Sequence, residues 1–291
     1  MYRMKRIFSN TKLIVLVSVV VVASFISVLV LKDGVKAENL LDDGSKKAAI
    51  IDQLDADIPN KYFQDEAVNY LEAAGYKVDL YTTKDITVDF YKRLPEMNYK
   101  FIVIRTHGVA DQSEEKSVML FTGERYTEDK YITEQIFGQV KRGTPLLEVQ
   151  FGANTDDSSE WQIVNDTYRV LKSPVKREDY AKDKYFGITP QLVDELMIGK
   201  FPGTTFLLGG CNTMTNPSMA QALIKRGALN VLGWSNPVGS GDNDTVMLLL
   251  LKEILINDAK IDDVVNQVAF MPFWSYQKYN STLKYYSETN A

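Results

Sequence analysis

The stretch Phe101-Ile-Val-Ile-Arg-Thr-His107-Gly108 runs from apolar, β-branched residues into a turn and carries the only histidine of the chain. A second stretch, Thr204-Thr-Phe-Leu-Leu-Gly-Gly-Cys211, has the same pattern and ends on the only cysteine. Short apolar runs that are bounded by turn-forming residues are typical of buried strands. If the two strands are neighbours in a parallel sheet, His107 and Cys211 lie together at its carboxyl edge.

Outward from these two stretches, short β-type runs alternate with segments in which apolar residues recur at helical spacing. The predicted strands are 48–52, 76–81, 101–104, 204–208 and 228–234, and the predicted helices are 61–74, 88–94, 189–197, 217–227, 244–256 and 261–268. Such alternation predicts an α/β fold, a mostly parallel sheet with helices on both faces. Residues from about 109 to 190 break the pattern, and we interpret them as an irregular insertion of hairpins and loops.

Composition narrows the classes of function. The 291 residues carry a net charge of -5, and no basic stripe is present that could neutralise the phosphates of a nucleic acid. One cysteine cannot form an intramolecular disulfide, and one histidine with one cysteine cannot supply the usual ligands of a zinc site. We therefore expect no cofactor and no metal. Calcium takes oxygen ligands, so Asp156-Asp157 and Asp242-Asn243-Asp244 remain possible ligands for this ion. The simpler interpretation is that they are solvated acidic loops.

Residues 13–31 form an uncharged apolar run whose length matches the hydrocarbon core of a bilayer at the rise of an α-helix. A basic tail at 1–12 precedes this run, and a polar linker at 32–46 follows it. The layout predicts a single-pass signal anchor, with the tail in the cytoplasm and the domain at 47–291 on the other side of the membrane. The alternative is a signal peptide that is cleaved after Val35-Lys36-Ala37 and leaves the domain secreted.

The only imidazole and the only thiol make the minimum apparatus of a cysteine hydrolase. In this hypothesis His107 removes the proton of Cys211, the thiolate attacks a carbonyl, and a thioester acyl-enzyme forms. The backbone N–H groups of Gly108 and Cys211 would form the oxyanion hole, and Gly210 would keep the approach to the sulfur free of side chains. Trp234, at the end of another predicted strand, is a candidate for substrate contact.

After the strand that ends in His107-Gly108, the chain carries Gly209-Gly-Cys-Asn-Thr213, then Ala220-x-Ala222-Leu-Ile-x-x-Gly227-Ala, then Gly233-Trp234 and a downstream Asp244. This series resembles the caspase-like cysteine peptidases of the caspase-hemoglobinase fold, in particular the gingipain-like and CHAT-type members. The resemblance covers roughly residues 47–256. It implies a catalytic dyad of His107 and Cys211, with an oxyanion hole formed by Gly108 and Cys211.

The chain departs from this family in two respects. Gly-Gly-Cys211-Asn-Thr replaces the caspase signature Gln-Ala-Cys-x-Gly, and the histidine and cysteine are 104 positions apart, about twice the caspase spacing of roughly 50. Caspase specificity for aspartate is therefore not implied, and metacaspase-like relatives have an aspartate where this chain has Gly209. Asp55, near Asp52 and Asp57, is a candidate for selecting a basic substrate side chain. The alternative is that these carboxylates are solvated or cap the next helix.

Together these observations predict a membrane-anchored cysteine endopeptidase that cleaves a peptide or protein substrate. The alternative from another class is a catalytically inactive caspase-like domain that serves as a binding or scaffold module at the membrane. The basic stretch at 172–184 is a candidate maturation site between the dyad residues, and an exposed charged loop is its simpler interpretation. Nothing in the sequence indicates the oligomeric state.

Overall fold

The computed structural model describes residues 46–110, 118–127, 129–131, 146–150, 184–271 and 273–289. In these parts of the chain, no helix is long and apolar enough to cross a bilayer. The predicted anchor at 13–31, the acidic pair Asp156-Asp157 and most of the basic stretch at 172–184 lie outside the described residues. What the sequence predicts for these three segments stays a prediction.

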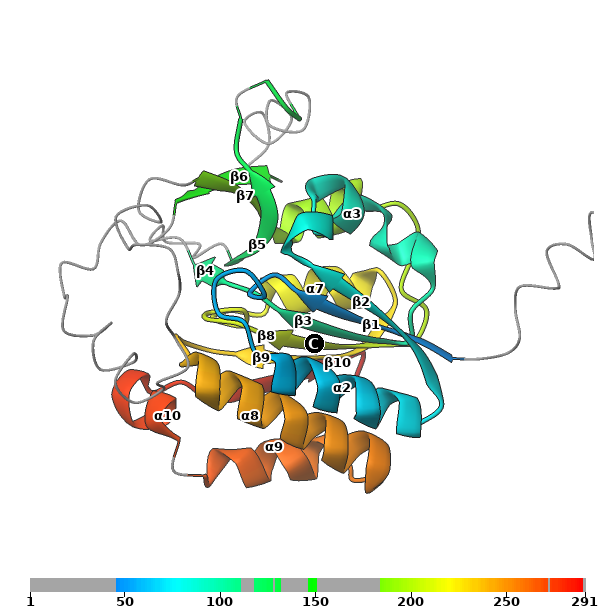
Figure 1. Ribbon diagram of the computed structural model, residues 1–291, viewed down its shortest axis with the longest axis vertical. Helices are drawn as coiled ribbons and strands as arrows, with labels where there is room; N and C mark the ends of the chain where they lie inside the picture. The colour runs from blue at the N-terminus through cyan, green and yellow to red at the C-terminus, as the bar shows by residue number, and fades with distance from the viewer. Residues whose placement is uncertain are drawn as a thin grey trace, which may run out of the picture. The chain divides into compact units, whose positions relative to one another are not determined.

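The central sheet has six strands in the order β2-β1-β3-β8-β9-β10 (Figure 1). The strands are β1 (Lys46–Asp52), β2 (Tyr76–Thr82), β3 (Phe101–Arg105), β8 (Thr204–Gly209), β9 (Ala228–Trp234) and β10 (Leu283–Ser287). The first five are parallel, and β10 runs antiparallel to β9 at one edge. The predicted α/β architecture with a mostly parallel sheet is therefore confirmed.

The two strands that lead to His107 and Cys211 are direct neighbours. β3 pairs with β8 in parallel along its length, with Arg105 opposite Gly209 at the carboxyl end. The strand order also reverses between β1 and β3, because the chain goes from β1 outward to β2 and returns to the far side of β1. In open α/β sheets, ligands bind beside such a switch point at the carboxyl ends of the strands. The expected pairing of the two strands is confirmed, next to that switch point.

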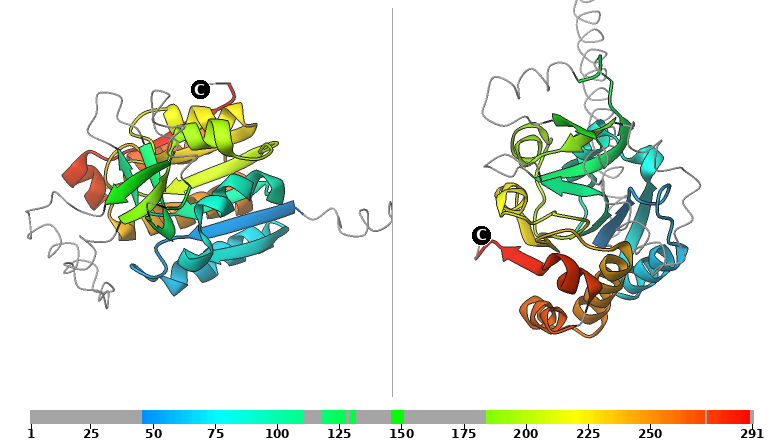
Figure 2. Two further views of the ribbon diagram at one scale, coloured as in Figure 1. Left: turned by 90° about the horizontal axis from the view of Figure 1, so that it is seen from above. Right: turned by 90° about the vertical axis from the view of Figure 1, so that its left-hand side faces the viewer.

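Helices cover both faces of the sheet, and each face has its own core. One face carries α2 (Lys61–Ala73), α8 (Ser240–Leu251) and α9 (Ile261–Ala269), and the other carries α3 (Val88–Arg93) and α7 (Ser218–Lys225), as Figure 2 shows. In β3, Phe101 and Val103 point to the first face, and Ile102 and Ile104 point to the second. β3 is buried on both sides, which explains its continuous apolar run.

Helix α2 shows how local sequence signals position the loop before it. Asn60 is the N-cap residue, and its side chain accepts a hydrogen bond from the Phe63 N–H. Phe63, Ala67 and Leu71 recur at helical spacing and are fully buried against the sheet. The helix cap therefore determines where the β1–α2 loop (residues 53–60) ends.

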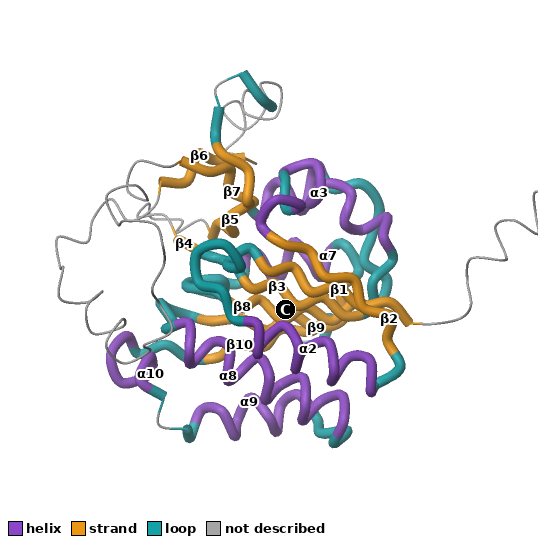
Figure 3. Tube along the Cα trace, viewed as in Figure 1, coloured by secondary structure: helices purple, strands orange, loops and turns teal. Residues whose placement is uncertain are grey.

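The region that we interpret as an insertion contains a second, antiparallel sheet of four strands in the order β4-β5-β7-β6 (Figure 3). These strands are β4 (Gly108–Ala110), β5 (Val118–Arg125), β6 (Leu146–Gln150) and β7 (Lys184–Ile188). Val118, Leu120, Phe186 and Ile188 bury their side chains in the core that α3 and α7 share. β4 begins directly after His107, so the second sheet fixes the position of the chain on the carboxyl-terminal side of that residue.

Several elements differ from the predictions. α8 begins at Ser240 rather than at 244, because its first turn buries polar residues at 242–244 that a pattern-based prediction assigns to a loop. The segment predicted as a helix at 189–197 is helical, but most of it is a π-helix, η3 (Leu192–Leu196), rather than an α-helix. β7, α10 (Trp274–Tyr279) and β10 are not predicted from the pattern at all. β7 pairs with β5 and β6, and β10 pairs with β9.

α2 has two adjacent aromatic residues, one buried and one exposed, so substituting each in turn compares how much a core residue and a surface residue contribute to the free energy of unfolding. Phe63 is fully buried, whereas Tyr62 is 69% exposed. We expect Phe63→Ala to lower the free energy of unfolding by about 3–5 kcal/mol, since it removes a buried ring and leaves a cavity. Tyr62→Ala should change that free energy by less than about 0.5 kcal/mol. Urea denaturation of both variants measures the difference, and equal effects would contradict the buried position of Phe63.

Candidate active site

The backbone segments at the carboxyl ends of β3 and β8 are in direct contact. The Thr106 N–H donates to the Gly209 carbonyl at 2.8 Å, which continues the strand pairing beyond β3. A Cβ atom on Gly210 would lie 2.2 Å from the Thr106 carbonyl oxygen, and one on Gly108 would lie 2.2 Å from the Cys211 carbonyl oxygen. Glycine is therefore required at both positions. The two segments that carry the predicted dyad touch through their main chains.

The Cys211 thiol lies against the β9–α8 loop (residues 235–239). Its Sγ donates to the Val238 carbonyl and accepts from the Val238 N–H, each at 3.4 Å. Both hydrogen bonds that the structure describes for this sulfur are with Val238 rather than with His107. Burial raises the pKa of the Cys211 thiol, and the Val238 N–H offsets part of that rise. The resting side chain is therefore a neutral thiol at neutral pH.

His107 lies between a carboxylate, an amide and an aromatic ring. Its Nε2 is 3.5 Å from Asp57 Oδ2, and each of these two side chains is 18% exposed. The main-chain N–H of His107 donates to Gln53 Oε1 at 3.0 Å, and its ring packs edge-on against Phe121. Burial lowers the pKa of His107, Asp57 raises it in part, and the nearby Arg105 lowers it. The imidazole is therefore neutral at neutral pH and can accept a proton.

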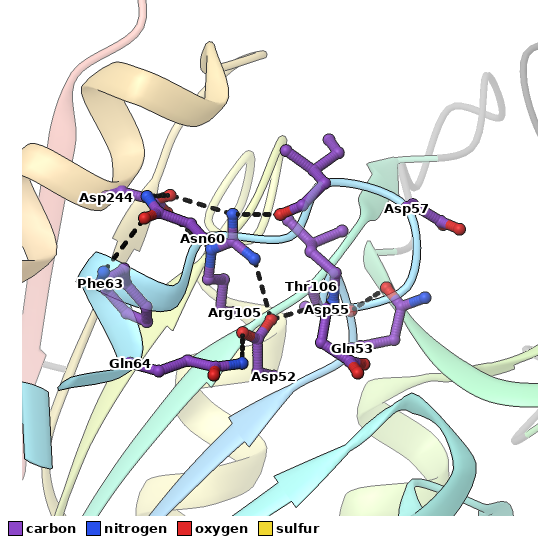
Figure 4. Close-up of polar contacts among 12 residues, drawn as sticks. Asp52, Gln53, Asp55, Asp57, Asn60, Phe63, Gln64, Arg105, Thr106 and Asp244 are labelled. Carbon is purple, nitrogen blue, oxygen red and sulfur yellow. Dashed lines mark hydrogen bonds and ion pairs between the residues drawn. The ribbon is translucent and has the colours of Figure 1, made fainter. Parts of the chain in front are cut away.

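Asp57 belongs to the β1–α2 loop, and a buried arginine holds this loop (Figure 4). Arg105, at the end of β3, donates from Nε and Nη2 to the two oxygens of Asp244, at 2.7 and 2.9 Å. Its Nη1 donates to Asp52 at 2.9 Å, and Nη2 also donates to the Ile58 carbonyl at 2.9 Å. The side chains of Arg105 and Asp52 have no exposed surface. One cation thus joins β1, β3, α8 and the loop that carries Asp57.

The main-chain N–H of Gly108 points away from β5. The Phe121 N–H donates to the His107 carbonyl at 3.0 Å, so these two residues occupy a hydrogen-bonded position of the antiparallel ladder. Such positions alternate with non-hydrogen-bonded ones, and Gly108 opposite Leu120 is one of the latter. The Gly108 N–H is therefore not used to pair with β5. It is one of the two donors that the sequence predicts for an oxyanion hole.

Two side chains that are predicted to contact substrate are engaged within the protein. Asp55 accepts hydrogen bonds from the Thr83 N–H, at 2.6 Å, and from the Thr83 hydroxyl. The Trp234 side chain is buried at 2% exposure, and its indole N–H donates to Asn243 Oδ1 at 3.0 Å. Asp55 therefore holds the short turn that begins at Thr83, and Trp234 lies in the core. Substrate contact by either residue stays a prediction.

The carboxylates at 242 and 244, which the sequence leaves open as calcium ligands, have partners within the protein. Asp242 accepts from the Ser275 N–H and hydroxyl, at 2.7 and 2.6 Å, and Asp244 is bound by Arg105. Among the residues that the structure describes, no three or more His, Cys, Asp or Glu side chains group in a way that could hold a metal ion. The two carboxylates tie the first turn of α8 to its neighbours.

The sequence pattern does not indicate Gln53, Arg105 or Val238 as site residues, and it suggests substrate selection rather than a contact with His107 for Asp57 and its neighbours. Arg105 carries a signal that could have identified it, since a charged residue inside a buried apolar strand needs a buried partner. Gln53 and Val238 carry no such signal. Their contacts with the dyad arise only when two loops fold back over the strand ends.

No protein-family model and no curated protein matches this chain. The structure establishes an α/β protein with a mostly parallel six-stranded sheet. At the carboxyl edge of that sheet, the segments that carry the only histidine and the only cysteine adjoin. The resemblance to caspase-like peptidases is carried by the motif residues at 107–108, 209–213 and 233–234.

The two pKa shifts predict how the sole thiol reacts with iodoacetamide. Only the thiolate reacts, and burial raises the pKa of Cys211, so alkylation should be slow at pH 7 and should rise only above the ordinary thiol range. Because the pKa of His107 is lowered, the imidazole is neutral at and above the ordinary histidine pKa. A thiolate–imidazolium pair would give an alkylation rate that stays constant across about pH 5 to 8, and we expect no such plateau.

Mass spectrometry of Cys211 labelling over time at each pH measures this profile. Urea-unfolded protein is the control, and it should show an ordinary thiol profile. Full-rate labelling of the folded protein at about pH 6, well below the ordinary thiol pKa, would contradict a neutral resting pair.

Proposed function

We propose that this protein is a cysteine endopeptidase of the caspase-like class, in which Cys211 is the nucleophile and His107 is the general base. The observation that carries the proposal is the main-chain contact between Gly108 and Cys211, because it joins the segments of the only imidazole and the only thiol. The motif resemblance points to the same residues. A mostly parallel sheet with helices on both faces agrees with what the resemblance implies.

The proposed reaction begins with a neutral pair. His107 takes the proton of the Cys211 thiol, and the thiolate attacks the carbonyl carbon of the scissile peptide bond. The N–H groups of Gly108 and Cys211 donate to the oxyanion that forms. The protonated imidazole then gives its proton to the leaving amine, the C–N bond breaks, and a thioester remains. His107 finally activates a water molecule that hydrolyses the thioester and restores the thiol.

Val238 holds the Cys211 thiol before the proton transfer to His107. In the resting state the thiol donates to the Val238 carbonyl, so proton transfer to His107 requires the sulfur to leave that carbonyl. The Val238 N–H also donates to the sulfur, and this bond favours the thiolate because a donor faces the negative charge. Substrate binding beside the β9–α8 loop is the event that we expect to release the thiol.

Asp57 stabilises the imidazolium that forms during the reaction. Its carboxylate faces Nε2, and we assign Nδ1 as the nitrogen that accepts the proton of Cys211. A carboxylate beside a catalytic histidine fixes the tautomer of the ring and favours its charged form. The partial rise that Asp57 causes in the pKa of His107 has the sign that this role requires.

The proposal extends to the substrate and to the location of the domain. The substrate is a peptide or protein, and the reaction uses no cofactor and no nucleic acid. The apolar run at 13–31 would hold the catalytic domain at the outer surface of a membrane, with secretion after cleavage as the alternative. Specificity for aspartate is not part of the proposal, because the caspase signature around Cys211 is replaced.

An inactive binding or scaffold module is the alternative from a different class, and one observation favours it. The Cys211 sulfur bonds to both main-chain groups of Val238, and burial raises its pKa so that it stays protonated. If the thiol never leaves this position, the domain cannot attack a carbonyl. Its surface rather than its dyad would then carry the function.

A panel of peptides that end in a thiol-reactive group tests the proposal. The panel varies the residue before the reactive group among basic, acidic, apolar and small side chains. We expect at least one peptide to label Cys211 of the full chain, because peptide binding brings the reactive carbon to the released sulfur. His107→Gln should be labelled about 100-fold more slowly or worse, which is the usual contribution of a general base.

Cys211→Ser is the matched control, because it keeps the shape of the side chain and removes the thiol. Its circular dichroism spectrum and thermal midpoint should match those of the wild type, and no peptide should label it. If no peptide labels the wild type while iodoacetamide still labels Cys211 at high pH, the endopeptidase proposal fails in favour of the binding module.

A further inference from the structure

We propose that Arg105 is a positioning residue of the site, because it fixes the β1–α2 loop so that Asp57 stays beside His107. The inference rests on the proposed function, since the place of Asp57 matters for chemistry only if His107 serves as a base. Arg105 lies too deep to meet a substrate, because its side chain has no exposed surface. It acts through the loop to which its Nη2 group donates.

Three partners fix the plane of the Arg105 guanidinium. Asp244, from α8, accepts from Nε and Nη2 in a bidentate pair, and Asp52, from β1, accepts from Nη1. The guanidinium carbon lies 5.4 Å from the centre of the Phe63 ring, on α2. With the plane held in this way, Nη2 has one further acceptor, the Ile58 carbonyl at 2.9 Å. The guanidinium therefore sets the position of the loop at Ile58.

The same two carboxylates hold both ends of the β1–α2 loop (Figure 4). Asp52 accepts from the Leu54 N–H at 3.1 Å, at the start of the loop. Asp244 accepts from Asn60 Nδ2 at 2.8 Å, at the end of the loop, where Asn60 also caps α2. The contact of the guanidinium with the loop lies between these two points. One ion-pair cluster thus holds the loop at three places.

Held in this way, the β1–α2 loop contacts His107 at two points. Asp57, the residue before Ile58, faces Nε2 at 3.5 Å, and Gln53 Oε1 accepts the His107 N–H at 3.0 Å. The Gln53 N–H in turn donates to the Arg105 carbonyl at 2.8 Å. A displacement of about 1 Å is enough to disturb a catalytic arrangement, so loss of the cluster should separate Asp57 from the imidazole.

Arginine is the only side chain that can make this set of contacts with a permanent charge. Its planar fork donates in several fixed directions, whereas lysine has one ammonium group on a flexible stem. A lysine at position 105 would keep the positive charge and its electrostatic effect on His107. One nitrogen, however, cannot reach Asp52, Asp244 and the Ile58 carbonyl together. Arg105→Lys therefore removes the positioning while it keeps the charge.

The single histidine makes the test direct, because NMR can follow its imidazole protons in the full chain without any substrate. The charged groups that act on His107 are Asp57, from the loop, and Arg105, from the strand before it. Asp57→Asn should lower the pKa of His107, because it removes the carboxylate that raises it. Arg105→Lys should lower this pKa as well, and Asp57→Asn should then add little in the Arg105→Lys background.

Two helix-cap variants separate positioning from stability. Asn60→Ala removes the bond of the loop to Asp244 and the cap of α2. Thr87→Ala removes the corresponding cap of α3, where the Thr87 side chain accepts from the Phe90 N–H. Neither substitution changes a charge, and both should lower the thermal midpoint. Only Asn60→Ala should also lower the pKa of His107.

Equal His107 pKa values in the wild type and in folded Arg105→Lys would overturn the inference, as would an equal effect of Asp57→Asn in both backgrounds. If Arg105→Lys does not fold, the two cap variants decide, and a shift in both or in neither overturns the inference. These measurements need no peptide labelling. Failure of the endopeptidase proposal and failure of this inference are therefore distinguished.

Discussion

The buried pairing of the Arg105 guanidinium with Asp52 and Asp244 is the interaction on which the arrangement of the site depends. An intact buried ion pair adds little net stability compared with apolar residues of the same size, but removal of one partner is costly because it leaves a charge in a poorly polarisable surrounding. Burial raises the pKa of Asp52, and the guanidinium opposes that rise. The main effect of the ion pairs is therefore to fix geometry, since they join β1, β3, α8 and the β1–α2 loop around a single planar guanidinium.

Two loops that are far apart in the sequence each make a contact that favours the charged form of His107 or of Cys211. The β1–α2 loop brings Asp57 to His107 and raises the pKa of the imidazole, and the β9–α8 loop brings the Val238 N–H to Cys211 and lowers the pKa of the thiol. Both contacts favour the charged forms, whereas burial favours the neutral forms and is the larger effect at each residue. The resting pair is therefore neutral, and the two local contacts would stabilise the ion pair that the proposed proton transfer forms.

Local patterns predict an element well where burial and boundary signals agree. The helix predicted at 61–74 is α2, and the strand predicted at 228–234 is β9, because both have apolar residues at the right period and turn residues at their ends. β7 and β10 are missed although both contain strand-favouring aromatic residues, because each is a short run of five residues and its partner strand lies far away in the sequence. The first turn of α8 is missed because its buried polar residues resemble a loop in the sequence and find their partners only in the folded chain.

The segments that form the parallel strands, and the presence of a single imidazole and a single thiol next to two of them, can be read from the sequence alone, because periodicity and composition are local properties. Only the tertiary structure decided that β3 lies beside β8, that Gly108 touches Cys211, and that Asp57 faces His107. Each of these contacts joins residues that are far apart in the chain. Its free energy depends on the loops that close and on the cores that pack around it, and no short stretch of sequence carries that information.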